Sequence, residues 1–298
     1  MRAQHPGAHG RAVGFMLASC VCFAVLDTLS KFSAQFSPVT QTLWMRYAVQ
    51  VVITFVWWWR WLRPTLGAAF FQTLHPKFHL SRALLLNLST ALCFVGLRHM
   101  PLGEFTAIAF VAPIFSMLMA AWLLKESPRR IQWVFAALGF VGVLIVIRPG
   151  SDLFGWAVGF PLALALVNAC FQTLTRRLAI SDDHPVLGQM FVGVAGLLAF
   201  SVPLLWPGTF HWNLLAWQWL ALLALGVAGT LGHFFLLRAF ALDNAAALAP
   251  LSYVQIGFAM LAGWLVFSHT PDDWALVGML VVGISGAASA WRRQPVLR

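Results

Sequence analysis

Three charged side chains lie well inside apolar stretches of the sequence, where a charge has to be paired or hydrated. They are Asp27, Lys31 and Arg46. Asp27 and Lys31 are four residues apart and would share one face of a helix, while Arg46 would lie at a similar depth on the next helix. A charge at mid-bilayer costs about 3 kcal/mol on insertion scales, so we expect the Asp27 carboxylate to be bridged to one or both cations.

This charged group is compatible with three roles. It can hold two helices together, because intramembrane ion pairs often have a structural function. It can bind a solute, since two cations against one carboxylate leave a positive charge that suits a carboxylate or phosphate group. Asp27 can also take up a proton as a coupling ion, and on that hypothesis Asp27→Asn weakens activity more than folding.

Uncharged polar groups recur inside other apolar stretches. Asn168 and Gln172 are four apart on one face, and this face is expected to point inward, toward Asn87, because amides facing lipid are costly. Tyr253 and Gln255 are two apart, so at most one of them points at a cavity. Their amide and aromatic groups suit a heterocyclic solute, although hydrogen bonding between helices explains them equally well.

His233 is the one histidine expected within a span. It is more readily explained as a hydrogen-bonded interior residue than as a proton relay. The candidate residues of a solute pathway are therefore Asp27, Lys31, Arg46, Asn87, Asn168, Gln172, His233, Tyr253 and Gln255.

A bilayer-length apolar run from Glu104 to Arg130 carries Pro113 at its middle. The proline leaves the Ala109 carbonyl without its usual partner, so the helix should be kinked or locally opened. A similar run returns at 245–267, and aligning the two places Glu126 on His269. The second copy has Ile256 in place of the proline, but further kinks are expected at Pro161 and Pro250.

The composition excludes a soluble domain. The chain is 60% hydrophobic and 9% charged, with a mean hydropathy of +0.81, and a soluble fold could not bury that much apolar surface. Its net charge of +10 does not indicate nucleic acid, because the cations lie singly or in pairs at the ends of apolar runs.

The sequence contains no recognisable enzyme motif. The sequence lacks the usual nucleophile, zinc and phosphate-loop signatures. Its four cysteines, Cys20, Cys22, Cys93 and Cys170, fall inside apolar runs and indicate neither disulfides nor a metal site. We therefore expect no catalytic residue, no metal and no cofactor, and any transport would be driven by a gradient.

Ten spans of about 20 residues account for most of the chain. All ten should be helices, which makes this an all-α integral membrane protein. The expected spans are 12–35, 41–62, 81–98, 103–124, 130–148, 154–176, 186–206, 214–237, 245–267 and 273–291.

The distribution of lysine and arginine predicts the orientation. With both termini in the cytoplasm, the outer loops hold only Arg98 and Arg148. The chain divides into two repeats, 1–148 and 149–298, of five spans each. Because five is odd, the second repeat must enter the membrane from the other side, as in the inverted repeats of many transporters.

These residues resemble the drug/metabolite transporter superfamily, and within it the proteins with two EamA domains. The resemblance covers nearly the whole chain and looks nearest to a proteobacterial branch that includes riboflavin and S-adenosylmethionine carriers. The residues that carry it are Lys31, Ser37-Pro38, Arg46, Ala112-Pro113, Leu124-Lys125-Glu126, Gly232-His233-Phe234, Arg238-Ala239 and the run from Ala249 to Gln255. It implies ten helices in two inverted halves and transport of small organic solutes across a bacterial inner membrane.

The sequence thus predicts a secondary active transporter of a small metabolite, working by alternating access as a monomer or homodimer. Its expected partners are the solute, the lipid bilayer and a proton as candidate coupling ion, without nucleic acid. Two alternatives remain. One is a membrane-embedded enzyme on lipid-linked substrates, for which Glu104 with His99 is the best available dyad; the other is a non-transporting membrane scaffold.

Overall fold

The computed structural model describes residues 8–67, 73, 75–112, 114–115, 118–119, 130–147, 155–178, 185–242, 248 and 251–291. Within these ranges the regular structure is entirely helical, which confirms the all-α class. The helices are α1 (Ala8–Ser33), α2 (Val39–Trp57), η1 (Trp58–Leu62), α3 (Arg63–Leu66), α4 (Pro76–His99), α5 (Leu102–Ala109), α7 (Arg130–Ile147), η3 (Trp156–Val158), α8 (Gly159–Leu178), α9 (Pro185–Ser201), η4 (Pro203–Leu205), α10 (Ala216–Leu242), α12 (Val254–Phe267) and α13 (Asp273–Trp291).

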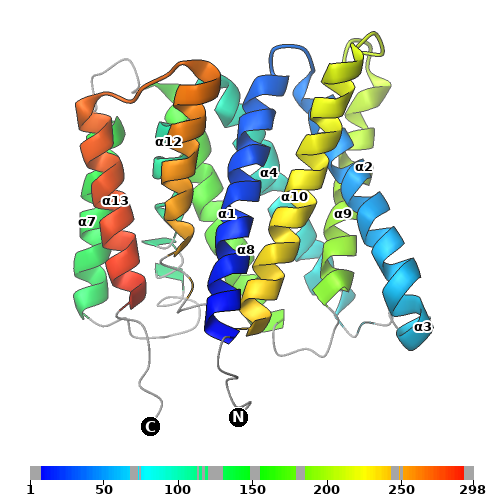
Figure 1. The fold of residues 1–298 in the computed structure, drawn as a ribbon, viewed down its shortest axis with the longest axis horizontal. Helices are drawn as coiled ribbons and strands as arrows, with labels where there is room; N and C mark the ends of the chain where they lie inside the picture. Colours follow the sequence, from blue (N-terminus) through cyan, green and yellow to red (C-terminus); the bar gives the residue numbers. More distant parts are fainter. Residues whose placement is uncertain are drawn as a thin grey trace.

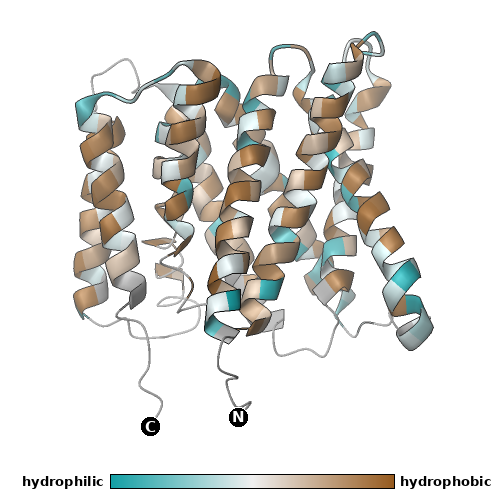
Figure 2. Ribbon diagram, viewed as in Figure 1, coloured by the Kyte–Doolittle hydropathy of each residue, from teal (hydrophilic) through white to brown (hydrophobic). Residues whose placement is uncertain are grey.

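Long apolar helices agree with a lipid environment. Four described helical segments are long and apolar enough to cross a membrane, namely His9–Ser33, Pro76–His99, Val186–Leu205 and Ala216–Leu242. Large apolar side chains such as Leu198, Leu265 and Ile284 are exposed on the outside of the bundle, where hydrocarbon rather than water would cover them. Apolar residues run along the helices in Figure 2, and hydrophilic ones gather toward their ends and in the loops.

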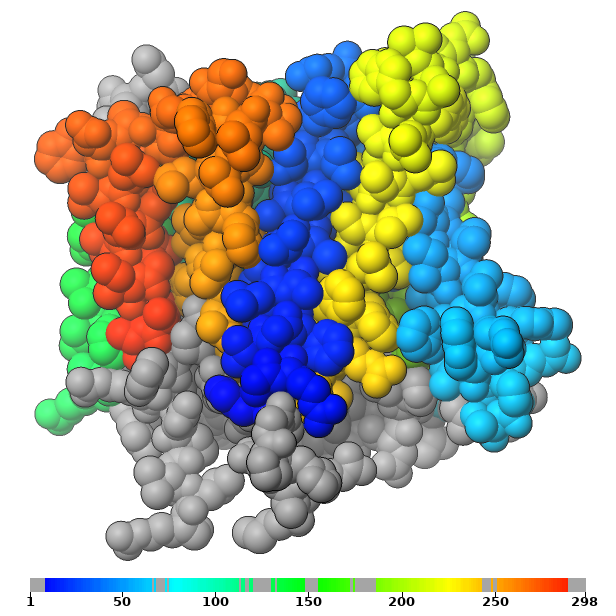
Figure 3. Space-filling view, in the orientation of Figure 1, coloured from blue at the N-terminus to red at the C-terminus, as the bar shows by residue number. Residues whose placement is uncertain are grey.

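The long helices form one upright bundle in which α1 begins and α13 ends on the same side (Figure 1). We call this the terminal side and the other the opposite side. α1 lies between α10 and α12 (Figure 3). α4 packs on α8 and α9, α2 packs on α9 and α10, α5 packs on α8 and α12, and α7 packs on α13 at one edge.

Glycines allow the closest of these helix crossings. A Cβ on Gly278 of α13 would lie 2.7 Å from the carbonyl oxygen of Gly142 on α7. A Cβ on Gly226 of α10 would lie 2.6 Å from the Cβ of Val49 on α2. Association of helices in lipid depends on such close packing, because the bilayer provides little hydrophobic drive.

Of the three prolines expected to kink a helix, only Pro161 lies within the described residues. α5 ends at Ala109, the residue whose carbonyl would face the missing N–H of Pro113, and the kink at Pro113 stays a prediction. Pro161 does not produce the expected kink: it lies in the first turn of α8, where a missing N–H costs no bond within the helix. Pro113 and Pro250 themselves lie outside the described residues.

Candidate functional site

The Asp27 carboxylate is the point at which three helices from distant parts of the chain meet. It accepts a hydrogen bond from Cys93 of α4, with Sγ 3.6 Å from Oδ1, and another from Gln255 of α12, with Nε2 3.4 Å from Oδ2. Asp27 is half-buried, although α1 packs against α4, α10 and α12. The residue as a whole therefore keeps part of its surface exposed, while its carboxylate is held inside the bundle by these two contacts.

Arg46 is buried beside this carboxylate, with 2% of its surface exposed. Its guanidinium lies over the ring of Tyr47, 4.6 Å from the centroid. Its Nε is 3.2 Å from the place that a Cβ on Gly229 of α10 would take, so this glycine admits the side chain. Among the described residues, neither Nε nor Nη1 has a hydrogen-bond partner, and an unpartnered buried charge is costly.

The bridge expected among the three charged residues is not formed. Among the described residues, Asp27 makes no ion pair within 4.0 Å with either Lys31 or Arg46, although the Arg46 charge acts on Asp27 over a longer distance. The Lys31 Nζ instead donates to the carbonyl oxygens of Leu97 and Met100, at 2.8 and 2.5 Å. Lys31 thus caps the C-terminal end of α4, where the helix dipole favours a cation.

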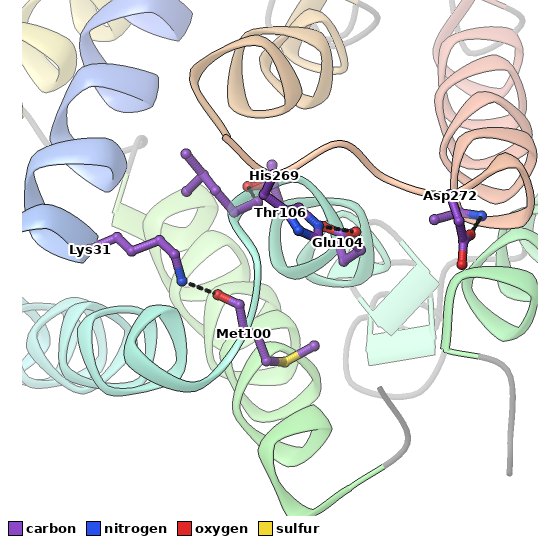
Figure 4. A network of polar contacts seen from close by, with 8 residues as sticks. Lys31, Met100, Glu104, Thr106, His269 and Asp272 are labelled. Carbon is purple, nitrogen blue, oxygen red and sulfur yellow. Dashed lines mark hydrogen bonds and ion pairs between the residues drawn. The ribbon is translucent and has the colours of Figure 1, made fainter. Parts of the chain in front are cut away.

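One polar contact that was not predicted from the sequence is the pair Glu104–His269. Oε1 of Glu104, in the first turn of α5, lies 2.9 Å from Nε2 of His269, in the connection between α12 and α13 (Figure 4). The Glu104 side chain is 5% exposed, and its Oε2 has no hydrogen-bond partner in the part of the chain that the structure describes. Lys31 is close enough for its charge to act on Glu104.

This pair replaces the dyad of Glu104 with His99. The His99 ring packs on Trp156, with centroids 4.7 Å apart, while Glu104 is held by His269. The sequence signal that could have pointed to it is weak: Glu104 is an acidic residue in a helix N-terminal turn, and its partner lies 165 positions away.

Some of the remaining residues predicted for a solute pathway lie in the interior, and others take part in contacts between helices. His233 of α10 is half-buried, its ring edge-on to Phe23 of α1 with centroids 5.0 Å apart. Asn168 of α8 accepts a 2.7 Å hydrogen bond from the Ser89 hydroxyl of α4, so its partner is Ser89 and not the expected Asn87. Asn87 is buried, and neither of its amide atoms has a hydrogen-bond partner within the described ranges. The Gln172 side chain lies outside the described residues.

Tyr253 and Gln255 point in different directions, as their spacing predicts. Gln255 reaches Asp27, whereas the Tyr253 ring packs on Phe110, 5.1 Å away between centroids. A Cβ on Gly286 of α13 would fall 1.8 Å from the Tyr253 ring. Tyr253 therefore fills the contact between α12 and its neighbours, and Gln255 faces the polar interior.

Two further sets of polar contacts were not predicted from the sequence: one between two buried glutamines, and one between a glutamine and a loop. Gln50 of α2 donates to the backbone oxygen of Gln189 on α9 at 3.1 Å. On the opposite side, Gln41 makes two hydrogen bonds with the backbone of His211, at 3.0 and 2.8 Å. These contacts tie α2 to α9 and to the loop that follows it.

Polar groups from both ends of the chain thus meet in an interior enclosed by apolar helices. Residues 10–148 match the model of the EamA-like transporter family. The chain carries an EamA-like transporter domain. This confirms the resemblance inferred from the sequence, and with it the prediction that the chain is a transporter-family protein and not an enzyme. The EamA-like domain and the apolar helices make it a multi-pass membrane protein.

Relatives of this EamA-like protein extend over most of its length. It is 25% identical to the S-adenosylmethionine uptake transporter of Rickettsia felis, over 91% of this chain and 89% of that one. It is 25% identical to the riboflavin transporter of Vibrio cholerae, over 92% and 90%. It is 27% identical to the pseudopaline exporter CntI of Pseudomonas aeruginosa, over 88% and 90%.

The fold also occurs in a solved crystal structure, which aligns with a TM-score of 0.66 and 19% identity. The alignment covers 97% of this chain and 100% of that one, so the same arrangement of helices extends through both halves of the EamA-like protein.

Proposed function

We propose that this protein is a secondary active transporter that moves a small organic solute across a bacterial inner membrane by alternating access. The observation that carries the proposal is the environment of Asp27. Its carboxylate is contacted by Cys93 from the first half and Gln255 from the second. A solute bound there would touch both halves, which is what a carrier needs if their relative movement is to open the site to each side in turn.

The helix contacts support an inverted repeat of 1–148 and 149–298. In such a repeat, α1, α2, α4, α5 and α7 correspond in order to α8, α9, α10, α12 and α13. If each helix is replaced by its counterpart in the other repeat, the contact of α1 with α10 becomes the contact of α8 with α4. In the same way, the contact of α1 with α12 becomes the contact of α8 with α5. The contact of α2 with α10 likewise becomes the contact of α9 with α4. Both members of each exchange are present.

We assign the opposite side of the bundle to the outside of the cell, because the lysine and arginine distribution favours cytoplasmic termini. On this assignment Glu104 and His269 form an outer gate that joins the halves. Lys31 supports the gate by fixing the end of α4. A proton on Asp27 is the proposed coupling ion, since this carboxylate lies in the interior and is held by neutral groups.

The test is counterflow in proteoliposomes loaded with unlabelled solute and given the labelled form. The panel contains amino acids, nucleosides, riboflavin and S-adenosylmethionine, because two of these are the solutes named for relatives. Wild-type protein should accumulate at least one label, and Asp27→Asn should reduce that accumulation while folding normally. Asp273→Asn, at an exposed position at the start of α13, is the matched control. Absence of counterflow for every solute would reject the transporter proposal and favour a scaffold.

A further inference from the structure

Opposite charges in the interior are held apart by separate contacts. The Asp27 carboxylate is drawn toward α4 and α12 by Cys93 and Gln255. The Arg46 guanidinium is held between α2 and α10, over the Tyr47 ring and against Gly229. The two are close enough to interact electrostatically, but no Arg46 nitrogen comes within 4.0 Å of a carboxylate oxygen of Asp27.

Each of the two groups retains unused bonding capacity. Arg46 has two buried donors, Nε and Nη1, without acceptors among the described residues, and a guanidinium donates best to the paired oxygens of a carboxylate or phosphate. Asp27 has one neutral donor on each oxygen, whereas a carboxylate has about four acceptor positions. An anionic group can therefore bind at Arg46 while a cationic donor binds at Asp27.

We propose that the transported solute is a zwitterion, with a carboxylate or similar anionic group bound by Arg46 and an ammonium bound by Asp27. The inference rests on the proposed transport function and narrows its substrate class. A solute of this kind satisfies the buried guanidinium without adding net charge to the interior. A neutral heterocycle leaves the guanidinium unpartnered, and a simple anion leaves the carboxylate unmatched.

The position of Gly229 is part of the proposal. Because a Cβ at this position would lie 3.2 Å from the Arg46 Nε, Gly229→Ala pushes the guanidinium away from α10 and out of register with its ligand. We expect this variant to weaken binding of the anionic end of the solute while the ammonium end still binds.

The experiment measures binding to purified, lipid-reconstituted protein by calorimetry. Its probes are amino acids and S-adenosylmethionine, each beside the analogue that lacks the carboxylate and the analogue that lacks the amino group. In the wild type, removing either group should weaken binding by about tenfold or more, as for other hydrogen bonds to charged groups. In Arg46→Gln, loss of the carboxylate should no longer matter, and in Asp27→Asn loss of the amino group should no longer matter.

Controls keep the outcome clear if a variant folds poorly. Arg46→Lys keeps the charge and should restore part of the carboxylate preference, and Arg238→Gln, at an exposed site on α10, should leave both preferences intact. If removing the carboxylate of the solute weakened its binding equally in the wild type and in Arg46→Gln, the proposal would be overturned. Counterflow of riboflavin or a simple anion without any zwitterion would overturn it too, while leaving the transport function standing.

Discussion

Glu104 and His269 form one of the contacts between the two halves of the chain, with Oε1 2.9 Å from Nε2. The glutamate is almost fully buried and the histidine is not, so removing the histidine leaves a carboxylate in an apolar place with neither oxygen paired. We expect His269→Ala to lower the free energy of unfolding by about 1–3 kcal/mol, measured by thermal unfolding. His99→Ala, an exposed histidine on the same side, should change it little. Equal effects of the two substitutions would contradict the assignment of a gate.

Lys31 is expected to affect stability more than solute selectivity. Its ammonium binds two carbonyls at the end of α4, and Lys31→Gln removes this cap. The expected loss is about 1–2 kcal/mol, the range of a charged hydrogen bond at a helix terminus. Thermal unfolding measures the loss, and calorimetry measures the preference for zwitterions. A stable Lys31→Gln variant that no longer distinguishes charged solutes would show that Lys31 belongs to the binding site.

The crossing of α7 and α13 should not tolerate a methyl group. In Gly278→Ala the new Cβ meets the Gly142 carbonyl oxygen at 2.7 Å and the backbone nitrogen of Val146 at 2.9 Å, neither of which can rotate away. We expect a destabilisation of about 1–3 kcal/mol from overpacking. Gly283→Ala lies on the same helix with nothing within 4 Å and should stay within about 0.5 kcal/mol of wild type. Chemical unfolding of both variants provides the comparison.

Cys93 gives a direct probe of the interior. Its thiol lies 3.6 Å from Asp27 and Cys93 as a residue is half-buried, so a small methanethiosulfonate reagent that enters the polar interior should label it in a variant without other cysteines. A transported solute should slow the labelling, because it occupies the space beside Asp27. Cys20 is buried, so it should label much more slowly in a variant that keeps Cys20 and lacks the other three cysteines. Labelling of Cys93 that no transported solute slows would place the solute elsewhere.

Acid should weaken solute binding through Asp27. A protonated carboxyl is neutral and cannot pair with an ammonium, so affinity for a zwitterion should fall as the pH is lowered and Asp27 takes up a proton. In Asp27→Asn the affinity should be lower at neutral pH and should lack this acid dependence. Calorimetry across the pH range provides the measurement, with Asp273→Asn as the control. An unchanged acid dependence in Asp27→Asn would assign the titrating group to another residue.

The sequence was informative where a local rule decides the structure. The helical class and the apolar stretches that contain the helices follow from the apolar runs. The opposite directions of Tyr253 and Gln255 follow from helical periodicity. Each of these depends only on neighbours along the chain.

The hydrogen-bond partners of the polar side chains were not predictable in the same way. The four-residue spacing of Asp27 and Lys31 places them on one face but does not say what else that face meets, and the long lysine stem reaches the end of α4 instead. The sequence offers His99 as the partner of Glu104, whereas the partner in the structure, His269, comes from the other half of the chain. Contacts of this kind depend on tertiary packing, which one sequence does not encode in its spacing.

Asp27 makes its hydrogen bonds with residues 66 and 228 positions further along the chain. During synthesis the first helix therefore enters the bilayer long before its last partner exists. We expect the nascent hairpin of α1 and α2 to remain beside the insertion machinery, or to be degraded, until α12 has emerged. The order in which the ribosome delivers the helices thus becomes part of how the interior is assembled, and chains cut after the first half should not accumulate.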